Sequence, residues 1–257
     1  MANESADQNL PTRAPTYSSA WVDEHTISIA GKAVEEKSNE ITAIPDVLDS
    51  IDLTGAVVSI DAMGTQTDIA QMIVESEADY VLALKRNHRH LSEDVKDAFT
   101  GRYTQFIYST LDKDHGRVEE RIYTALRPQE VLDESQYEPW KNLSSLVQVE
   151  RLVTFSDGTE RRDKQYYLSS LPAEAVERIG TYIRGHWGIE NRLHWHLDVT
   201  FREDHCRARK VYAAQNLNTI RKLALAIVSQ RKDKLSIRKR LFTAALNIDY
   251  LKELLKI

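Results

Sequence analysis

Two short runs of apolar residues constrain the fold of this chain more than any other feature of its sequence. Ala56–Ile60 and Tyr80–Leu84 are nearly uninterrupted apolar segments, which is typical of central strands in a sheet that is covered on both faces. The segment that begins at Thr67 places apolar residues at helical spacing, and Leu91–Phe99 predicts a further short helix. Strands that alternate with helices in this way pair in parallel through crossover helices, so the sequence predicts an α/β fold.

The flanking segments predict a hairpin, a β-rich insertion and a helical C-terminus. Alternating or continuous apolar residues in Tyr17–Val22 and Thr26–Val34 predict a strand hairpin, and helical spacing after Ser38 predicts a helix. Between residues 103 and 170 four segments predict strands: Phe106–Leu111, Arg117–Leu126, Leu146–Phe155 and Gln165–Ser170. After Pro172 three segments predict helices: Ala173–Leu197, Ala213–Gln230 and Leu235–Leu255.

Composition excludes several classes of protein. No apolar run approaches the roughly 20 residues that a membrane helix needs, and the polar residues 1–16 contain nothing like the core of a signal peptide. We therefore expect a cytoplasmic protein without a membrane partner, and a flexible tail over residues 1–16. Cys206 is the only cysteine, which excludes an intramolecular disulfide and a zinc site of the four-cysteine type.

Charge is distributed unevenly along the chain. The formal net charge is -5, which by itself argues against nucleic acid as a partner. Between residues 207 and 240, however, one acid, Asp233, stands against eleven basic residues: Arg207, Arg209, Lys210, Arg221, Lys222, Arg231, Lys232, Lys234, Arg238, Lys239 and Arg240. A polyanion responds to this local excess rather than to the average charge. The alternative is a set of surface helices whose charges simply face solvent.

Asp61 is the first candidate for chemistry. It follows the apolar run Ala56–Ile60 directly, and α/β folds place their ligands at this carboxyl edge of the sheet. A carboxylate there needs a metal ion or a basic partner to offset its desolvation. The alternative is a turn or helix-capping aspartate that serves only the next segment.

The second candidate site is a polar stripe on a predicted helix. His186, Glu190 and His194 are spaced by four residues each, so they share one face of an α-helix. A glutamate between two histidines fits a catalytic carboxylate whose histidine neighbours contact phosphates. It also fits a zinc site with two histidines and one carboxylate, as in a zinc hydrolase. A polar helix face in contact with water is the third interpretation.

Several motifs, in order along the chain, resemble the H-repeat-associated transposases of bacterial insertion sequences. The resemblance covers about residues 17 to 230 and rests on six segments: Lys37–Ile41, Ile60–Gly64, Ala78–Asn87, His115–Glu119, Arg184–Asn191 and Leu197–Asp204. These transposases belong to the DDE superfamily. The resemblance implies a ribonuclease-H-like mixed sheet flanked by helices, with a β-rich insertion over 103–170 before the last catalytic helix. It divides the chain into a tail (1–16), a catalytic domain (17–206) and a basic helical extension (207–257).

The resemblance also implies roles for the two acidic candidates. In this superfamily two aspartates and one glutamate hold Mg²⁺ or Mn²⁺; Asp61 matches the second aspartate and Glu190 the glutamate. Magnesium prefers oxygen ligands, and two such ions support in-line displacement at phosphorus. Related transposases follow a Tyr-x2-Arg-x3-Glu-x6-Lys pattern around this glutamate, whereas this chain has His186 in place of the arginine and Leu197 in place of the lysine.

The resemblance implies double-stranded DNA as the partner, both the insertion-sequence ends and the target. It is also compatible with a homodimer. Lys85 and Arg86 follow the second apolar run and are expected at the same sheet edge as Asp61, where they could hold DNA phosphates; a solvated charged loop is the alternative. The other candidate DNA contacts are His186, His194, Arg184, Arg207, Arg209 and Lys210.

The first aspartate of the superfamily has no counterpart in this sequence. It belongs to an Asp-Gly-Lys-like turn ahead of the hairpin, and upstream of Tyr17 only the polar segment with Asp7 is present. Asp23, in the hairpin turn, is a poor substitute. We therefore expect an N-terminally truncated transposase with impaired DNA cleavage and strand transfer, with an inactive DNA-binding remnant as the alternative.

Overall fold

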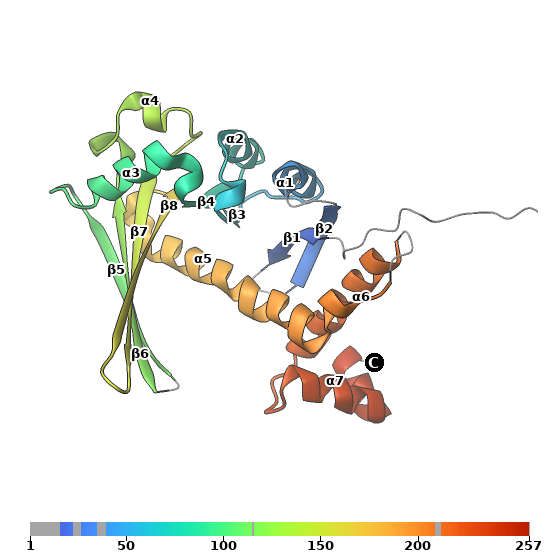
Figure 1. The fold of residues 1–257 in the computed structure, drawn as a ribbon. Coiled ribbons are helices and arrows are strands. Elements are labelled where there is room, and N and C mark those ends of the chain that lie inside the picture. The colour runs from blue at the N-terminus through green and yellow to red at the C-terminus, as the bar shows by residue number, and fades with distance from the viewer. Residues whose placement is uncertain (1–15, 23–26, 35–39, 115, 209–211, 257) are drawn as a thin grey trace, which may run out of the picture. The chain divides into compact units, whose positions relative to one another are not determined.

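A computed structural model describes residues 16–22, 27–34, 40–114, 116–208 and 212–256 (Figure 1). The chain forms two compact units, Asp52–His186 on the one hand and Met1–Ile51 with Trp187–Ile257 on the other. These limits differ from the domain limits expected from the sequence, which stay a prediction. Six expected features lie wholly or mostly outside the described residues: the tail, Asp7, Asp23, His115, Arg209 and Lys210.

The unit Asp52–His186 is built on one six-stranded mixed sheet. Its strands are β3 (Val57–Ile60), β4 (Asp79–Leu84), β5 (Phe106–Asp114), β6 (Arg117–Leu126), β7 (Ser145–Phe155) and β8 (Glu160–Ser169). They follow the order β3-β4-β8-β7-β6-β5. β3 and β4 are parallel, joined by the crossover helix α2 (Thr67–Glu75), and the other neighbours are antiparallel. The predicted mixed α/β class and the strands of segment 103–170 are confirmed.

The β-rich segment extends the same sheet as the parallel strands. β8 pairs with β4 through Leu82 and Leu168, which places β4 inside the sheet. β3 differs from the prediction of a buried central strand. Among the described residues it pairs only with β4, and its residues are half-buried because no described strand lies along its other edge.

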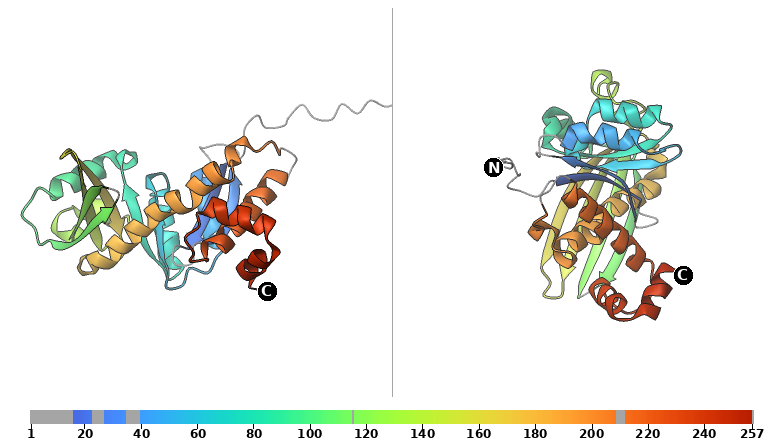
Figure 2. Two further views of the ribbon diagram at one scale, coloured as in Figure 1. Left: turned by 90° about the horizontal axis from the view of Figure 1, so that it is seen from below. Right: turned by 90° about the vertical axis from the view of Figure 1, so that its right-hand side faces the viewer.

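Helices pack against both faces of this sheet near β4 and β8 (Figure 2). Val81 and Ala83 of β4 share a buried cluster with Ile179 and Ile183 of helix α5 (Val176–Ile189). Successive strand residues point to opposite faces, so the buried Tyr80, Leu82 and Leu84 face the other side. Two helices contact the strands there: α2, against β4, and α3 (Arg89–Ala98), against β8. The short α4 (Glu134–Tyr137) lies between β6 and β7 in the chain.

Gly180 sets how closely α5 approaches the sheet. A Cβ atom built at this glycine would lie 3.1 Å from Cδ1 of Tyr123 on β6, which is closer than ordinary side-chain contacts. Tyr123 is 1% exposed. The absence of a side chain at Gly180 therefore allows the helix to pack directly on the tyrosine ring.

The other unit combines the predicted hairpin with the C-terminal helices. β1 (Thr16–Val22) pairs antiparallel with β2 (Ile27–Val34), and both contact α1 (Glu40–Asp49). Its apolar core contains Leu193, Leu197, Leu225, Val228 and Leu254. None of the described helices has the length and apolar character that a bilayer crossing requires.

The C-terminal helices are α6 (Ala213–Ser229), α7 (Ile237–Leu246) and α8 (Ile248–Leu255). The sequence predicts one helix over Leu235–Leu255, whereas the structure has two. Asn247 has extended backbone angles, and its side chain accepts hydrogen bonds from the backbone N–H groups of Asp249 and Tyr250 at 2.9 and 3.0 Å. This N-cap starts α8 and ends the predicted continuous helix.

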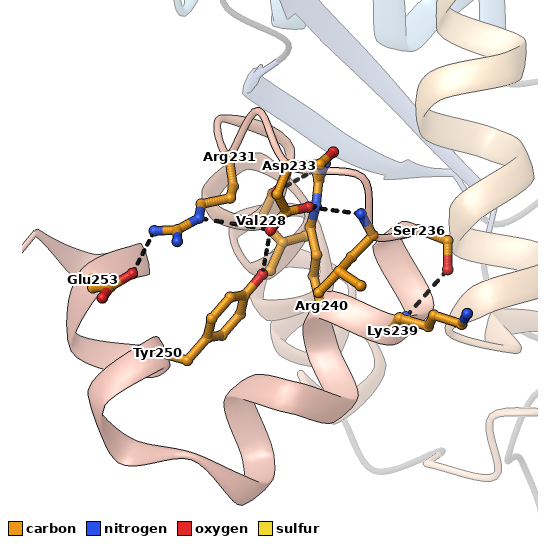
Figure 3. A network of polar contacts seen from close by, with 9 residues as sticks. Val228, Arg231, Asp233, Ser236, Lys239, Arg240, Tyr250 and Glu253 are labelled. Atoms are coloured by element: carbon orange, nitrogen blue, oxygen red, sulfur yellow. Dashed lines mark hydrogen bonds and ion pairs between the residues drawn. The ribbon is translucent and has the colours of Figure 1, made fainter.

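A buried arginine joins the ends of α6, α7 and α8 (Figure 3). Arg240 is 8% exposed; it donates from Nη1 to the Val228 carbonyl at 2.9 Å and from Nε to Oδ1 of Asp233 at 2.7 Å. Tyr250 donates its hydroxyl to Oδ2 of the same aspartate at 2.9 Å. Arg231 forms an ion pair with Glu253 at 2.7 Å. The loop between α6 and α7 is thus fixed by charged hydrogen bonds.

We expect Arg240→Ala to lower the free energy of unfolding by about 1–3 kcal/mol, because it leaves the Val228 carbonyl and the Asp233 carboxylate without their donor. Urea unfolding followed by circular dichroism measures the change. The exposed Arg238→Ala on the same helix is the matched control and should stay within about 0.5 kcal/mol of the unmodified chain. Equal losses in the two variants would contradict a structural role specific to Arg240.

Candidate active site at the carboxyl edge of β3 and β4

Asp61 lies directly after β3 and caps a single 3-10 turn, Ala62–Gly64. Its Oδ1 accepts a hydrogen bond from the Met63 backbone N–H at 3.1 Å, and the residue is exposed. The capping role that the sequence left open is therefore present. A carboxylate has about four acceptor positions, so this single contact is compatible with binding a cation at the sheet edge.

The loop that carries Asp61 is tied to the loop after β4. The buried Thr65 hydroxyl lies 2.7 Å from the Ala83 carbonyl and 3.1 Å from the Asp61 carbonyl. His88 Nε2 lies 2.6 Å from the Thr65 carbonyl; since a carbonyl only accepts, this nitrogen carries the proton. Asn87 donates to the Ala62 carbonyl. Sequence patterns do not predict the positioning role of Thr65, whose only sign in the sequence is its place between a predicted strand and a helix.

Lys85 and Arg86 lie at this same edge. They follow β4, which is parallel to β3 and in register with it, so both strands present their carboxyl ends together. Both cations are exposed, and neither forms an ion pair with another described residue. The structure thus places them near the Asp61 loop, while a role in binding DNA stays a prediction.

His186 reaches the same end of β3 from helix α5. Its Nδ1 lies 3.1 Å from the Ser59 hydroxyl. Ser59 is two residues before Asp61, and residues two apart in a strand lie on one face. Packing of Ile179 and Ile183 on the sheet holds α5 in this position. Asp61, His186, Lys85 and Arg86 therefore come from three segments that meet at one sheet edge.

Arg184 forms an ion pair with Asp112. Its Nη1 lies 2.7 Å from Oδ2 of Asp112, and Arg121 contacts the same carboxylate at 2.8 Å. The hydrogen bond from Arg184 holds the pKa of Asp112 below its ordinary value, against the opposing effect of desolvation. A DNA contact by Arg184 would have to share or replace this ion pair.

Glu119 continues this network inside the sheet. It is 5% exposed and makes short contacts to Arg151 and Arg121, with Arg117 at 3.9 Å. The hydrogen bond from Arg151, with the neighbouring arginine charges, lowers the pKa of Glu119 although burial acts in the opposite direction. Three arginines thus surround one buried carboxylate.

Glu190 and His194 belong to the other unit, and the backbone around them departs from the α-helix. The sequence predicts a continuous helix over Ala173–Leu197, but α5 ends at Ile189 and π-helical turns follow at Glu190–His194 and His196–Thr200. The regular α-helical spacing behind the proposed stripe therefore stops at the glutamate. Short π-helical turns occur often at functional sites. The side chain of Glu190 lies outside the described atoms, so its meeting with Asp61 stays a prediction.

His194 is exposed beside a group of acids. Partial burial raises the pKa of Asp198, neighbouring Asp204 and Glu203 add to this effect, and His194 opposes it. Glu203 accepts hydrogen bonds from Asn218 at 2.9 and 3.1 Å and pairs with Arg221 at 3.1 Å.

Arg207 and a possible metal-binding group were also predicted from the sequence, and both stay predictions. Arg207 is exposed. Within the described part of the chain no three histidine, cysteine, aspartate or glutamate side chains form a metal-sized group; this search does not include the Glu190 side chain.

The chain is similar to one family model and to several known proteins. The family model "Transposase DDE domain" matches residues 16–227. Two proteins of Escherichia coli (strain K12), "Putative protein YbfL" and "H repeat-associated putative transposase YhhI", are each 34% identical over 245 residues. "Putative transposase YncI" of Escherichia coli O157:H7 is 36% identical over 249 residues.

These relatives are longer than the chain. The matches cover 92% of this chain but 64%, 64% and 62% of the three relatives, respectively. Among solved structures, a piggyBac transposase synaptic complex with hairpin DNA aligns with a TM-score of 0.38 at 12% identity. That alignment covers 91% of this chain and 46% of the other.

We expect Thr65→Val to lower the free energy of unfolding by about 1–3 kcal/mol, because the buried Ala83 carbonyl loses its hydroxyl donor at nearly constant side-chain volume. Denaturant unfolding measures the effect. Thr67→Val, at an exposed position in the first turn of α2, is the control and should change the value by under about 0.5 kcal/mol. If the Thr65→Val protein is as stable as the control, the hydrogen bond between the two loops does not stabilise the fold.

Glu119→Gln should destabilise the protein by roughly 1–3 kcal/mol near neutral pH, because a buried charged acceptor is lost. The folded pKa of Glu119 is lowered, so its stabilisation is present above the ordinary glutamate pKa and is lost as pH falls through the lowered value. The difference in thermal midpoint between the variant and the unmodified chain should therefore shrink below about pH 4. The exposed Glu93→Gln serves as control. A difference that grows on acidification would contradict the sign of this shift.

Proposed function

Because the chain belongs to the family of transposases with a DDE domain, we propose that it acts on double-stranded DNA as an insertion-sequence transposase. The activity is DNA strand cleavage and strand transfer, and Asp61 and Glu190 are two of its metal-binding carboxylates. The observation that carries the proposal is the placement of Asp61 at the carboxyl edge of β3, with Lys85, Arg86 and His186 brought to the same edge.

The residues of this edge fit a hard divalent cation. Asp61 is exposed, and among its carboxylate oxygens Oδ1 accepts a hydrogen bond from the Met63 N–H. Mg²⁺ and Mn²⁺ prefer such oxygen ligands. When bound, such a cation makes the attacking oxygen more nucleophilic and stabilises the leaving oxygen. Asp61 and Glu190 would hold it.

The cationic residues have a different task in this proposal. Lys85 and Arg86 bind and orient DNA phosphates beside the Asp61 loop. His186 takes the place of an arginine in the related pattern. It can donate to a phosphate oxygen only when the ring nitrogen that faces the DNA carries a proton. The contact of the Ser59 hydroxyl with Nδ1 fixes the orientation of the ring at this edge.

A DNA-binding protein without cleavage activity is the second candidate. Asp61 and Glu190 are the two acidic candidates that the sequence offers for the metal site. Two carboxylates can bind a cation, but loss of one ligand from a shared site lowers the rate by orders of magnitude. A cytoplasmic location and a homodimer are consistent with both candidates and belong to the proposal.

We expect Asp61→Asn and Glu190→Gln each to reduce Mg²⁺-dependent cleavage of supercoiled plasmid by at least about 100-fold, because each removes a charged metal ligand. DNA affinity measured without metal should stay within a few-fold. The control is Asp97→Asn, which neutralises an exposed carboxylate at the end of α3.

The outcomes separate the two candidates. Cleavage by the unmodified chain that both active-site variants lose supports the transposase. DNA binding by all variants, with no cleavage by any, supports the DNA-binding protein. Cleavage that survives both Asp61→Asn and Glu190→Gln would overturn the proposed site.

A further inference from the structure

The cations of the loop between α6 and α7 and of the first turn of α7 fall into two groups. The segment Arg231–Arg240 contains six basic residues and one acid. Arg240 and Arg231 point into the network around Asp233 and Glu253. The other four cations are exposed and form no ion pair with another described residue: Lys232, Lys234, Arg238 and Lys239. We refer to these four as the outer cations.

The backbone beneath the outer cations is held in place. Asp233 accepts from Arg240 Nε at 2.7 Å and from the Leu235 backbone N–H at 2.9 Å, and its own carbonyl accepts from Arg240 Nη2 at 3.0 Å. Ser236 caps α7 by accepting from the Lys239 N–H at 3.4 Å. Figure 3 shows the Lys239 side chain directed away from this network. The outer cations thus lie on a loop and a helix start whose backbone is already ordered, which reduces the ordering that a ligand must impose.

The positive charge of this surface is not neutralised locally. Asp233 is the only acid between residues 230 and 241, and Arg240, Arg231 and Tyr250 already occupy its carboxylate. The buried Arg240 therefore pairs with the only acid of this sequence segment. Four positive charges remain in contact with solvent, as the recognition of a polyanion requires.

An open groove borders two of the outer cations. It has a volume of about 630 Å³ and is lined by Thr200, Ser236, Arg238, Lys239, Leu241 and Phe242. Arg238 and Phe242 lie four residues apart on α7, so they share one face, and the Phe242 side chain is 68% exposed. Basic side chains beside exposed apolar side chains fit the phosphates and sugars of a nucleic-acid backbone.

We propose that Lys232, Lys234, Arg238 and Lys239 form a sequence-independent binding surface for the phosphate backbone of double-stranded DNA. This inference rests on the proposed function, because DNA is the polyanion on which a transposase acts. The surface adds affinity to the contacts of Lys85 and Arg86 at the carboxyl edge. Its contribution depends on salt, because each phosphate contact releases condensed counterions.

The test compares two quadruple variants of the full chain with equal changes in charge. The first is Lys232→Gln, Lys234→Gln, Arg238→Gln, Lys239→Gln. The control neutralises three lysines and one arginine that are also exposed: Arg102→Gln, Lys141→Gln, Lys252→Gln and Lys256→Gln. Fluorescence anisotropy with a duplex of arbitrary sequence, in EDTA so that no cleavage occurs, gives the binding constant between about 50 and about 200 mM salt.

The first variant should show a salt dependence whose log–log slope is shallower by about 3–4, since each phosphate contact contributes about 0.9. Over this fourfold salt range the unmodified chain should lose about 100-fold more affinity than the variant. The control variant should match the unmodified slope. Replacing Lys232, Lys234 and Lys239 by arginine should retain binding, which shows that charge rather than a folding defect is responsible.

Other results would overturn the inference in distinguishable ways. Binding by the unmodified chain with equal slopes in all variants rejects the outer cations but keeps DNA as the partner. Equal losses in both quadruple variants mean that net charge, not this surface, determines affinity. Loss of binding to phosphatidylserine vesicles with unchanged DNA binding assigns the surface to membranes. No DNA binding by the unmodified chain, even at low salt, rejects both this inference and the proposed function.

Discussion

The hydroxyl of Thr65 connects the two loops on which the candidate active site depends. Parallel pairing brings the carboxyl ends of β3 and β4 to one edge, but strand pairing alone leaves the loops beyond them free to diverge. The contact of Thr65 with the Ala83 carbonyl, and of His88 with the Thr65 carbonyl, closes the Asp61 loop onto the Lys85–Arg86 loop. An acidic residue and two cations thereby stay close without an ion pair between them.

The sequence predicts the carboxyl edge of β3 and β4 because the patterns that identify it lie within short segments of the chain. Two apolar runs identify the strands, and the polar residues that end each run must then lie at the same edge. It could not predict that β8 would pair with β4, because nothing in a strand sequence specifies a partner about 86 residues away. The π-helical turn at Glu190 escapes prediction for a related reason: apolar spacing is nearly the same in an α-helix and in one widened turn.

Helix α5 carries His186, and the π-helical turn with Glu190 follows it directly. Gly180 and the apolar Ile179 and Ile183 fix its first turns against the sheet, and this packing delivers His186 to Ser59. Four residues later the backbone changes to a π-helical turn that begins at Glu190. Short π-helical turns of this kind are frequent at functional sites.

Net charge is a poor guide to the partner of this chain, because some charged side chains are buried in ion pairs whereas others are exposed to solvent. The formal net charge of the chain is -5. Some basic residues pair with acids inside the fold, as Arg240 does, and others face solvent, as Lys239 does. Buried or half-buried cations such as Arg240 and Arg121 compensate carboxylates and stabilise the fold, so they contribute little external field. Exposed cations on a fixed backbone retain their full attraction for phosphate. Since acids paired inside the fold are removed from the external field together with their partners, an acidic protein can still present a local surface that attracts a polyanion.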